Sequence, residues 1–182
     1  MRFTPTSLEG VLIVELEPHA DERGFFARSF CVDEFAARGL RTDVLQCNVS
    51  FNRRRGTLRG MHFQVAPRAE AKLVRCTRGA LLDVVVDLRP ASPTYCRWVG
   101  VELGGEAAPH RALYVPEGFA HGFQTLEDDT EVFYQMFERF SAEHARGVRW
   151  DDPAFGIRWP LPDPILSDKD RSYPLLAAPP RG

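Results

Sequence analysis

The sequence predicts an all-β protein, built as a β-sandwich or barrel from many short strands. Six segments are rich in the β-branched and aromatic residues that strands favour. Turn-forming Gly, Pro and Ser residues divide these segments at near-regular intervals, and no long helical pattern lies between them. The six predicted strands are 11–16, 72–76, 81–88, 99–103, 112–115 and 131–137.

Local turn chemistry sets the limits of these strands. Glycine accepts backbone conformations that other residues avoid, and proline lacks the N–H donor that a central strand requires. Both residues therefore tend to end strands and to open turns. The predicted turns are 78–79, 90–93, 104–105 and 116–118.

Two short helices are expected, at 33–38 and 141–146. The first has acidic residues in its first turn, which favours a helix N-terminus, and Gly39 as its stop. The second ends at Gly147 in the same way. From Asp151 onward, repeated prolines exclude a long helix, so we expect this tail to lie as irregular chain over the sandwich.

Length and composition indicate one soluble domain over residues 1–182. A chain of this size can bury roughly two-thirds of its unfolded surface, and 44% hydrophobic with 26% charged residues is typical of globular proteins. A net charge of -2 argues against electrostatic capture of nucleic acid. No apolar run approaches about 18 residues and no signal-peptide pattern is found, so we expect a cytoplasmic protein without a membrane partner.

The segment 58–64, with the sequence LRGMHFQ, is the most informative for function. It places His62 in a short extended run close to Gly60, where a backbone or a ligand can approach. Lys72 opens a predicted strand ten residues later, and Tyr134 lies in another. A histidine base, a lysine cation and a tyrosine proton donor are the groups needed to take a proton from carbon and return one.

These residues also have structural interpretations. Lys72 is either directed inward, against a carboxylate or an anionic ligand, or placed at the sheet rim with its stem on apolar surface. A histidine in a strand is commonly structural, but a carboxylate bonded to one ring nitrogen of His62 would favour a base. Asp83 and Asp170 are the candidate carboxylates, and Arg59 is a neighbouring cation.

The sequence predicts neither a metal site nor a cofactor. No H-x-H pair occurs, and the histidines other than His62 are spread widely along the chain. The four cysteines form no C-x-x-C pair, which speaks against zinc ribbons and redox motifs. The P-loop, the Rossmann glycine motif and the G-x-S-x-G motif of serine hydrolases do not occur either.

Eight blocks of sequence match one family in order and approximate spacing. They are DERGFF at 21–26, QCNVS at 46–50, LRGMHFQ at 58–64, KLVRC at 72–76, SPTY at 92–95, VPEGFAHGF at 115–123, DDP at 151–153 and LSDKD at 166–170. Each block is a weak signal by itself. Together they cover nearly the whole chain, which therefore resembles the dTDP-4-dehydrorhamnose 3,5-epimerases.

The resemblance implies a cupin-type double-stranded β-helix, or jelly roll, with a few short helices. It also implies a homodimer that uses neither a metal nor an organic cofactor. The implied activity is that of an isomerase. The implied substrate is a nucleotide-linked 4-keto-6-deoxyhexose, expected to carry dTDP, that is epimerised at C3 and C5 on the way to L-rhamnose.

The resemblance assigns roles to residues at matching positions. His62 looks like the base, Asp170 like its orienting partner, and Tyr134 like the acid that returns a proton from the opposite face. Lys72 resembles the cation beside the developing enolate. Substrate-binding positions are implied for Arg23 at the diphosphate, Phe25 and Phe26 near the nucleotide, and Gln46, Asn48, Arg59, Asp83, His121 and Phe140 in the pocket.

Phe140 departs from the family pattern, because a tyrosine is common six residues after the proposed acid. Ala142 likewise stands where proline is common. Loss of the tyrosine hydroxyl would change how the sugar is held, so an epimerase of C3 alone or C5 alone, acting on a related nucleotide sugar, is a second interpretation. A third is a catalytically silent sugar-binding cupin, against which the joint presence of the four catalytic residues argues. A metal-dependent cupin dioxygenase is a weaker one.

Overall fold

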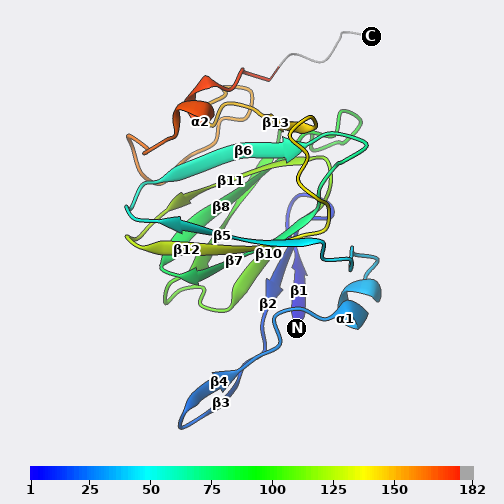
Figure 1. The fold of residues 1–182 in the computed structure, drawn as a ribbon, viewed down its shortest axis with the longest axis vertical. Helices are drawn as coiled ribbons and strands as arrows, with labels where there is room; N and C mark the ends of the chain where they lie inside the picture. Colours follow the sequence, from blue (N-terminus) through cyan, green and yellow to red (C-terminus); the bar gives the residue numbers. More distant parts are fainter. Residues whose placement is uncertain (177–182) are drawn as a thin grey trace.

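The computed structural model describes residues 1–176 as a sandwich of two antiparallel β-sheets (Figure 1). The six-stranded sheet has the order β1 (Arg2–Pro5), β2 (Leu12–Glu15), β10 (Arg111–Val115), β7 (Lys72–Arg78), β12 (Thr130–Met136) and β5 (Gln46–Asn52). The five-stranded sheet has the order β13 (Ala145–Gly147), β6 (Leu58–Gln64), β11 (Phe119–Thr125), β8 (Ala80–Asp87) and β9 (Trp98–Gly104). The predicted all-β sandwich is therefore confirmed.

A hairpin and two short helices complete the described chain. The hairpin β3 (His19–Asp21) and β4 (Gly24–Phe26) projects beyond the sandwich (Figure 1). The helices are α1 (Val32–Ala36), at the lower right of the view, and α2 (Asp168–Ser172), at its upper left. Within residues 1–176, no helix has the length and apolar character needed to cross a membrane.

The six predicted strands are present, with limits within two residues of those expected, and the extended run 58–64 is β6. The prediction misses β1, β3, β4, β5, β11 and β13. Two of these carry polar residues where a strand pattern would be apolar. β5 reads QCNVSFN, and β11 contains His121, Gly122 and Gln124 although all of its residues are buried.

One predicted helix is confirmed and one is wrong. Helix α1 overlaps the expected 33–38, beginning one residue earlier and ending two residues earlier. Residues 141–146 form no helix, because the chain makes a single turn at Ser141 and then pairs as β13 with β6. Sheet pairing outweighs the local preference here. Helix α2 is an additional element in the tail, capped by Ser167, whose hydroxyl accepts the Asp170 N–H at 3.1 Å.

Three apolar clusters hold these layers together. The largest lies between the sheets, where Val74 and Val132 of one sheet meet Val85 and Phe123 of the other. A second cluster packs α1 against the outer face of the six-stranded sheet through Phe35, which is fully buried. In the third, tail residues 155, 157 and 159 cover the outer face of the five-stranded sheet. The expectation that the tail lies over the sandwich is confirmed.

Close backbone contact between β6 and β11 fixes the register of the two strands that carry His62 and His121. These histidines are direct partners in the pairing. Gly60, two residues before His62, has φ +144, and a Cβ at this position would lie 2.6 Å from the Cα of Gly122, which follows His121. Only glycine allows this approach without backbone movement.

Gly60→Ala should therefore lower the free energy of unfolding by about 2–4 kcal/mol, because overpacking adds to the cost of positive φ. Urea denaturation measures this loss. The matched control is Gly39→Ala, at φ +68 with no heavy atom within 4 Å of the added Cβ, which should cost only about 1 kcal/mol. Equal losses of unfolding free energy in the two variants would show that the close approach to Gly122 adds nothing to the cost of Gly60→Ala.

Candidate active site

A cavity of about 340 Å³ is lined by residues of both sheets and of the segments that follow them. Strands β6 and β11 contribute from the five-stranded sheet, and β5, β7 and β12 from the six-stranded sheet. Seven of the residues predicted from the sequence line it. They are Asn48, Arg59, His62, Lys72, His121, Tyr134 and Phe140.

His62 lies on the cavity wall and is paired with Asp170. Its Nε2 is 2.6 Å from Asp170 Oδ1, and the aspartate side chain is only 6% exposed whereas the histidine is 40% exposed. Burial raises the pKa of Asp170, but the hydrogen bond and charge of His62, with the Ser167 hydroxyl, outweigh it and leave the pKa below its usual value. With Nε2–H donated to an ionised carboxylate, the imidazole keeps its lone pair on Nδ1 and can accept a proton there.

Asp83 is the partner of a different histidine. Its Oδ1 lies 2.6 Å from His121 Nε2, and both side chains are buried. Asp83 lies on β8, behind His121, and does not line the cavity. Among the described residues, no hydrogen-bond partner contacts its second oxygen, Oδ2. Asp83 therefore orients His121 and adds negative charge that acts on Tyr134.

Tyr134 enters the cavity from the opposite sheet to His62. Its ring stands at 85° to that of His121, with 6.3 Å between centroids. Burial raises the pKa of Tyr134, and the charge of Asp83 raises it further, while Arg59 opposes them. The phenol is consequently protonated at neutral pH, as a group that donates a proton must be.

Lys72 is directed inward rather than placed at the rim. It is 5% exposed, and its Nζ lies 2.6 Å from Glu70 Oε1. The sequence analysis did not find Glu70. The spacing could have indicated it, because residues two apart in an extended segment, such as Glu70 and Lys72, point to the same side. The sequence analysis also missed Arg146, Lys169 and Tyr173 on the cavity wall, the last of which packs edge-on against His62 with 5.6 Å between ring centroids.

A segment after β12 borders the cavity and is held by two glutamines. Phe140 is 63% exposed, and its backbone N–H donates to Gln46 Oε1 at 2.7 Å. Gln46 itself does not line the cavity. Gln64 Oε1 accepts the Ser141 N–H at 2.6 Å, while its Nε2 donates to the carbonyl of Arg139 at 3.2 Å. These contacts fix the backbone that presents the Phe140 ring.

Three predicted substrate-binding residues do not reach this cavity. Arg23, Phe25 and Phe26 belong to the hairpin that projects from the sandwich (Figure 1). Arg23 pairs with Asp21, and the exposed Phe25 ring stacks edge-on with His110, at 4.6 Å between centroids. Within one chain, these residues are separate from the cavity that holds His62.

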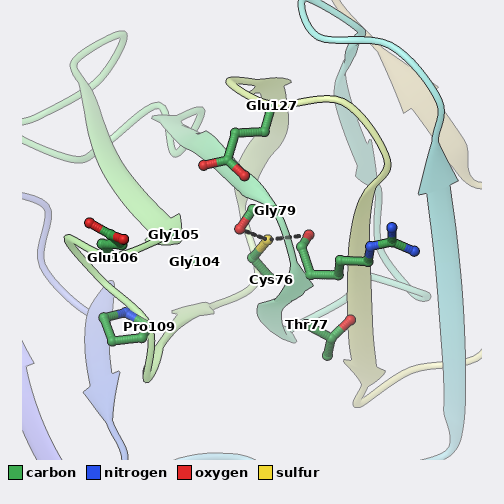
Figure 2. A pocket seen from close by; sticks show the side chains of 9 residues that line it. Cys76, Thr77, Gly79, Gly104, Gly105, Glu106, Pro109 and Glu127 are labelled. Carbon is green, nitrogen blue, oxygen red and sulfur yellow. Dashed lines mark hydrogen bonds between the residues drawn. The ribbon is translucent and has the colours of Figure 1, made fainter.

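A second hollow, of about 600 Å³, lies at the opposite end of β7 from Lys72 (Figure 2). The Cys76 thiol there donates to the carbonyls of Arg78 and Gly79, at 3.1 and 3.3 Å. Burial raises the pKa of Cys76 to about 11, so the thiol is not a nucleophile at neutral pH. Among the residues described, this hollow has no histidine, lysine or tyrosine in its wall. Residues 1–176 contain no group of three His, Cys, Asp or Glu side chains placed to hold a metal.

Comparison with known proteins gives one consistent match. A family model described as dTDP-4-dehydrorhamnose 3,5-epimerase matches residues 5–178. A Sinorhizobium fredii protein of that name is 46% identical over 177 residues, covering 97% of this chain and 90% of the relative. A Streptomyces niveus protein named dTDP-4-dehydrorhamnose 3-epimerase is 41% identical over 178 residues, covering 97% of this chain and 84% of the relative.

The fold agrees with a solved structure of the same name. The crystal structure of a Bacillus anthracis dTDP-4-dehydrorhamnose 3,5-epimerase, with TDP and PPi bound, superposes with a TM-score of 0.91 and 43% identity. The match covers 96% of this chain and 99% of that one. The predicted cupin-type jelly roll is thereby confirmed. This chain belongs to the dTDP-4-dehydrorhamnose 3,5-epimerase family and is an isomerase.

Proposed function

We propose that this chain, as a single domain over residues 1–182, is the cofactor-independent 3,5-epimerase of dTDP-4-dehydro-6-deoxy-D-glucose in dTDP-L-rhamnose biosynthesis. One observation carries the proposal: His62 and Tyr134 line a single cavity from opposite sheets. The name of the Sinorhizobium fredii relative supports the sugar and the reaction. The TDP bound to the Bacillus anthracis protein supports the nucleotide.

The chemistry follows from the ketone at C4 of the sugar. A carbanion at C3 or C5 is delocalised onto the C4 oxygen, so the hydrogens on both carbons are acidic. His62 removes one of them, Lys72 stabilises the enolate oxygen, and Tyr134 delivers a proton to the other face. Positioned proton transfer contributes roughly 100- to 10,000-fold in rate, and charge stabilisation of the enolate often contributes more.

The charge of the cavity suits a substrate that carries two phosphate groups. Arg59, Arg146 and Lys169 are cations in its wall, in addition to Lys72. Arg59 donates its Nε–H to Asn52 Oδ1 at 2.8 Å, which orients the guanidinium and leaves its Nη donors for an anion. We infer that these side chains bind the diphosphate.

A homodimer would give the projecting hairpin a role. Arg23, Phe25 and Phe26 do not line the cavity of their own chain, so substrate contacts from them require the cavity of a second copy. Phe25 and Phe26 are 57% and 76% exposed, which is unusual for large apolar side chains without a partner surface. Strand β5, at one edge of its sheet, also exposes Val49 and Phe51. Both features support an assembly of two chains.

A cytoplasmic location fits the state of the cysteines. Cys31, Cys47, Cys76 and Cys96 are all free thiols, although a compartment that oxidises thiols would favour pairing. The nucleotide-sugar substrate proposed above also fits a location where nucleotides are made.

Incubation with dTDP-4-dehydro-6-deoxy-D-glucose in heavy water tests the function directly. We expect deuterium at both C3 and C5, because each carbon must lose its proton to the base and regain one derived from solvent. Proton NMR of the product measures the loss of the two signals. Deuterium at neither carbon, in folded protein, would contradict the proposal and favour a catalytically silent sugar-binding cupin.

A C3-only or C5-only epimerase is the second candidate, and Phe140 is the observation that favours it. The ring lies in the cavity wall without a hydroxyl to hold the sugar. The Streptomyces niveus relative, named as a 3-epimerase, supports C3 as the single centre. Deuterium confined to one carbon in the same experiment would favour this candidate over double inversion.

A further inference from the structure

Glu70 is the sole carboxylate among the described residues that line the cavity. It precedes β7 and meets Lys72 through a 2.6 Å contact between Oε1 and Nζ. The two side chains are 10% and 7% exposed. The cation that faces the substrate in the proposed reaction is therefore already paired inside the protein.

A carboxylate in this position requires an explanation. The substrate is an anion, so a free negative charge in the cavity wall would oppose its binding. A buried ion pair also adds little to stability, because desolvation of both charges offsets their attraction. Pairing with Lys72 neutralises the negative charge that would oppose the substrate. Because the pair also adds little stability, its benefit must lie in the function of Lys72.

Glu70 can restrict where the Lys72 ammonium points. A lysine side chain carries about 2 kcal/mol of rotamer entropy, and its ammonium has three N–H donors. When Glu70 accepts one donor, the nitrogen is held in one place and two donors are left for the substrate. Donors that are already in position when charge develops need no reorganisation during the reaction.

The segment that carries Glu70 is itself anchored on both sides. Gln64 Nε2 donates to the carbonyl of Arg68 at 2.9 Å, and the Phe137 N–H donates to the carbonyl of Ala71 at 3.0 Å. Gln64 lies two residues after His62 on β6. The carboxylate is thus tied to the strand that bears the proposed base, and to the chain that follows β12.

We propose that Glu70 is a positioning residue that holds the Lys72 ammonium against the C4 oxygen of the substrate. This inference rests on the proposed function, because it assigns Lys72 to the enolate. Glu70 itself takes no part in proton transfer. Its effect passes through Lys72 alone.

A double-mutant cycle tests this dependence. E70Q should lower kcat by about 10- to 100-fold with KM within about twofold of wild type, because misplacement of a catalytic group affects mainly the chemical step. E70Q should have no further effect in a K72M background, since the group it positions is gone. E70D keeps the charge but withdraws the carboxylate by one methylene, and should show a smaller loss of kcat even if E70Q folds poorly.

The matched control is E15Q, which removes a glutamate that pairs with Arg2 at 2.7 Å and with Arg111 at 3.3 Å, outside the cavity wall. It should leave kcat and KM unchanged. Wild-type kcat in both E70Q and E70D would overturn the proposal. A further loss in the K72M background would also overturn it, because Glu70 would then act on the substrate directly. A change in KM without a change in kcat would overturn it as well.

A spectroscopic measurement checks the contact without any turnover. The chain has only two lysines, Lys72 and Lys169, so protein with 13C at the lysine Cε gives two resolved side-chain signals. E70Q should move the Lys72 signal and leave that of Lys169 in place. An unmoved Lys72 signal would overturn the contact. If the wild-type protein showed no turnover of dTDP-4-dehydro-6-deoxy-D-glucose, the proposed function would fail. The role of Glu70 would fail with it, even if the Lys72 signal moved.

Discussion

His62→Ala should abolish measurable exchange of substrate hydrogen with solvent deuterium, a loss of about 100- to 10,000-fold. The imidazole is oriented by its 2.6 Å contact with the Asp170 carboxylate, and its side chain is 40% exposed whereas that of His121, the other carboxylate-paired histidine of the cavity, is 5% exposed. Alanine leaves in place Lys72, the proposed cation beside the enolate, and Tyr134, the proposed acid, but removes the proposed base. Neither inversion nor exchange without inversion is then possible.

The loss must be separated from unfolding and from failure to bind. His62 is partly exposed on a cavity wall, so its truncation should leave the thermal unfolding midpoint close to that of wild type. Binding of dTDP, measured by calorimetry, should also stay close to wild type, because the proposed nucleotide contacts are made by other residues. Deuterium exchange near the wild-type rate in His62→Ala would show that His62 is not the base.

The sequence predicts strands that are rich in apolar residues, whether they line the core or the site. The predicted strands 81–88 and 131–137 are rich in Val, Leu or aromatic residues, so composition finds them, although the second also carries Tyr134 into the cavity. Strands β5 and β11 carry Asn48 and His121 into the cavity, and these polar residues interrupt the pattern that marks a strand. A strand in which polar site residues replace the apolar pattern is for this reason harder to recognise than one that keeps it.

Contacts between distant residues explain the remaining differences. Family resemblance brings His62, Lys72, Tyr134 and Asp170 to one place, and the structure places them around one cavity or directly behind it. The pairing of Asp83 with His121 depends on strand register, which the sequence leaves open. The same holds for residues 141–146, where pairing with β6 replaces the expected helix.

If the proposed homodimer forms, the role of the hairpin depends on assembly rather than on local sequence. Its three predicted substrate contacts are exposed and separate from the cavity of the same chain. A sequence pattern within one chain does not indicate whether a site is formed by two chains. Sequence blocks can match a family at such positions, but they do not indicate which subunit is contacted.

Tyr134→Phe should impair inversion far more than proton removal. His62 remains, so the substrate should still lose its hydrogen and regain deuterium from the same side, with its configuration kept. Without the hydroxyl, the opposite face loses its proposed proton donor, and formation of the inverted product should fall by about 100-fold or more. Proton NMR in heavy water follows both quantities in one sample, as deuterium in recovered substrate and as inverted product.

Tyr114→Phe is the matched control, because Tyr114 is also a buried tyrosine on the six-stranded sheet. Its hydroxyl accepts the Arg41 N–H at 3.3 Å in the apolar cluster beside α1, away from the cavity. This variant should leave exchange and inversion unchanged while costing about 1 kcal/mol of stability. If exchange and inversion fell equally in Tyr134→Phe, the phenol would act before or during proton removal. The acid on the second face would then have to be sought among the other groups of the cavity wall.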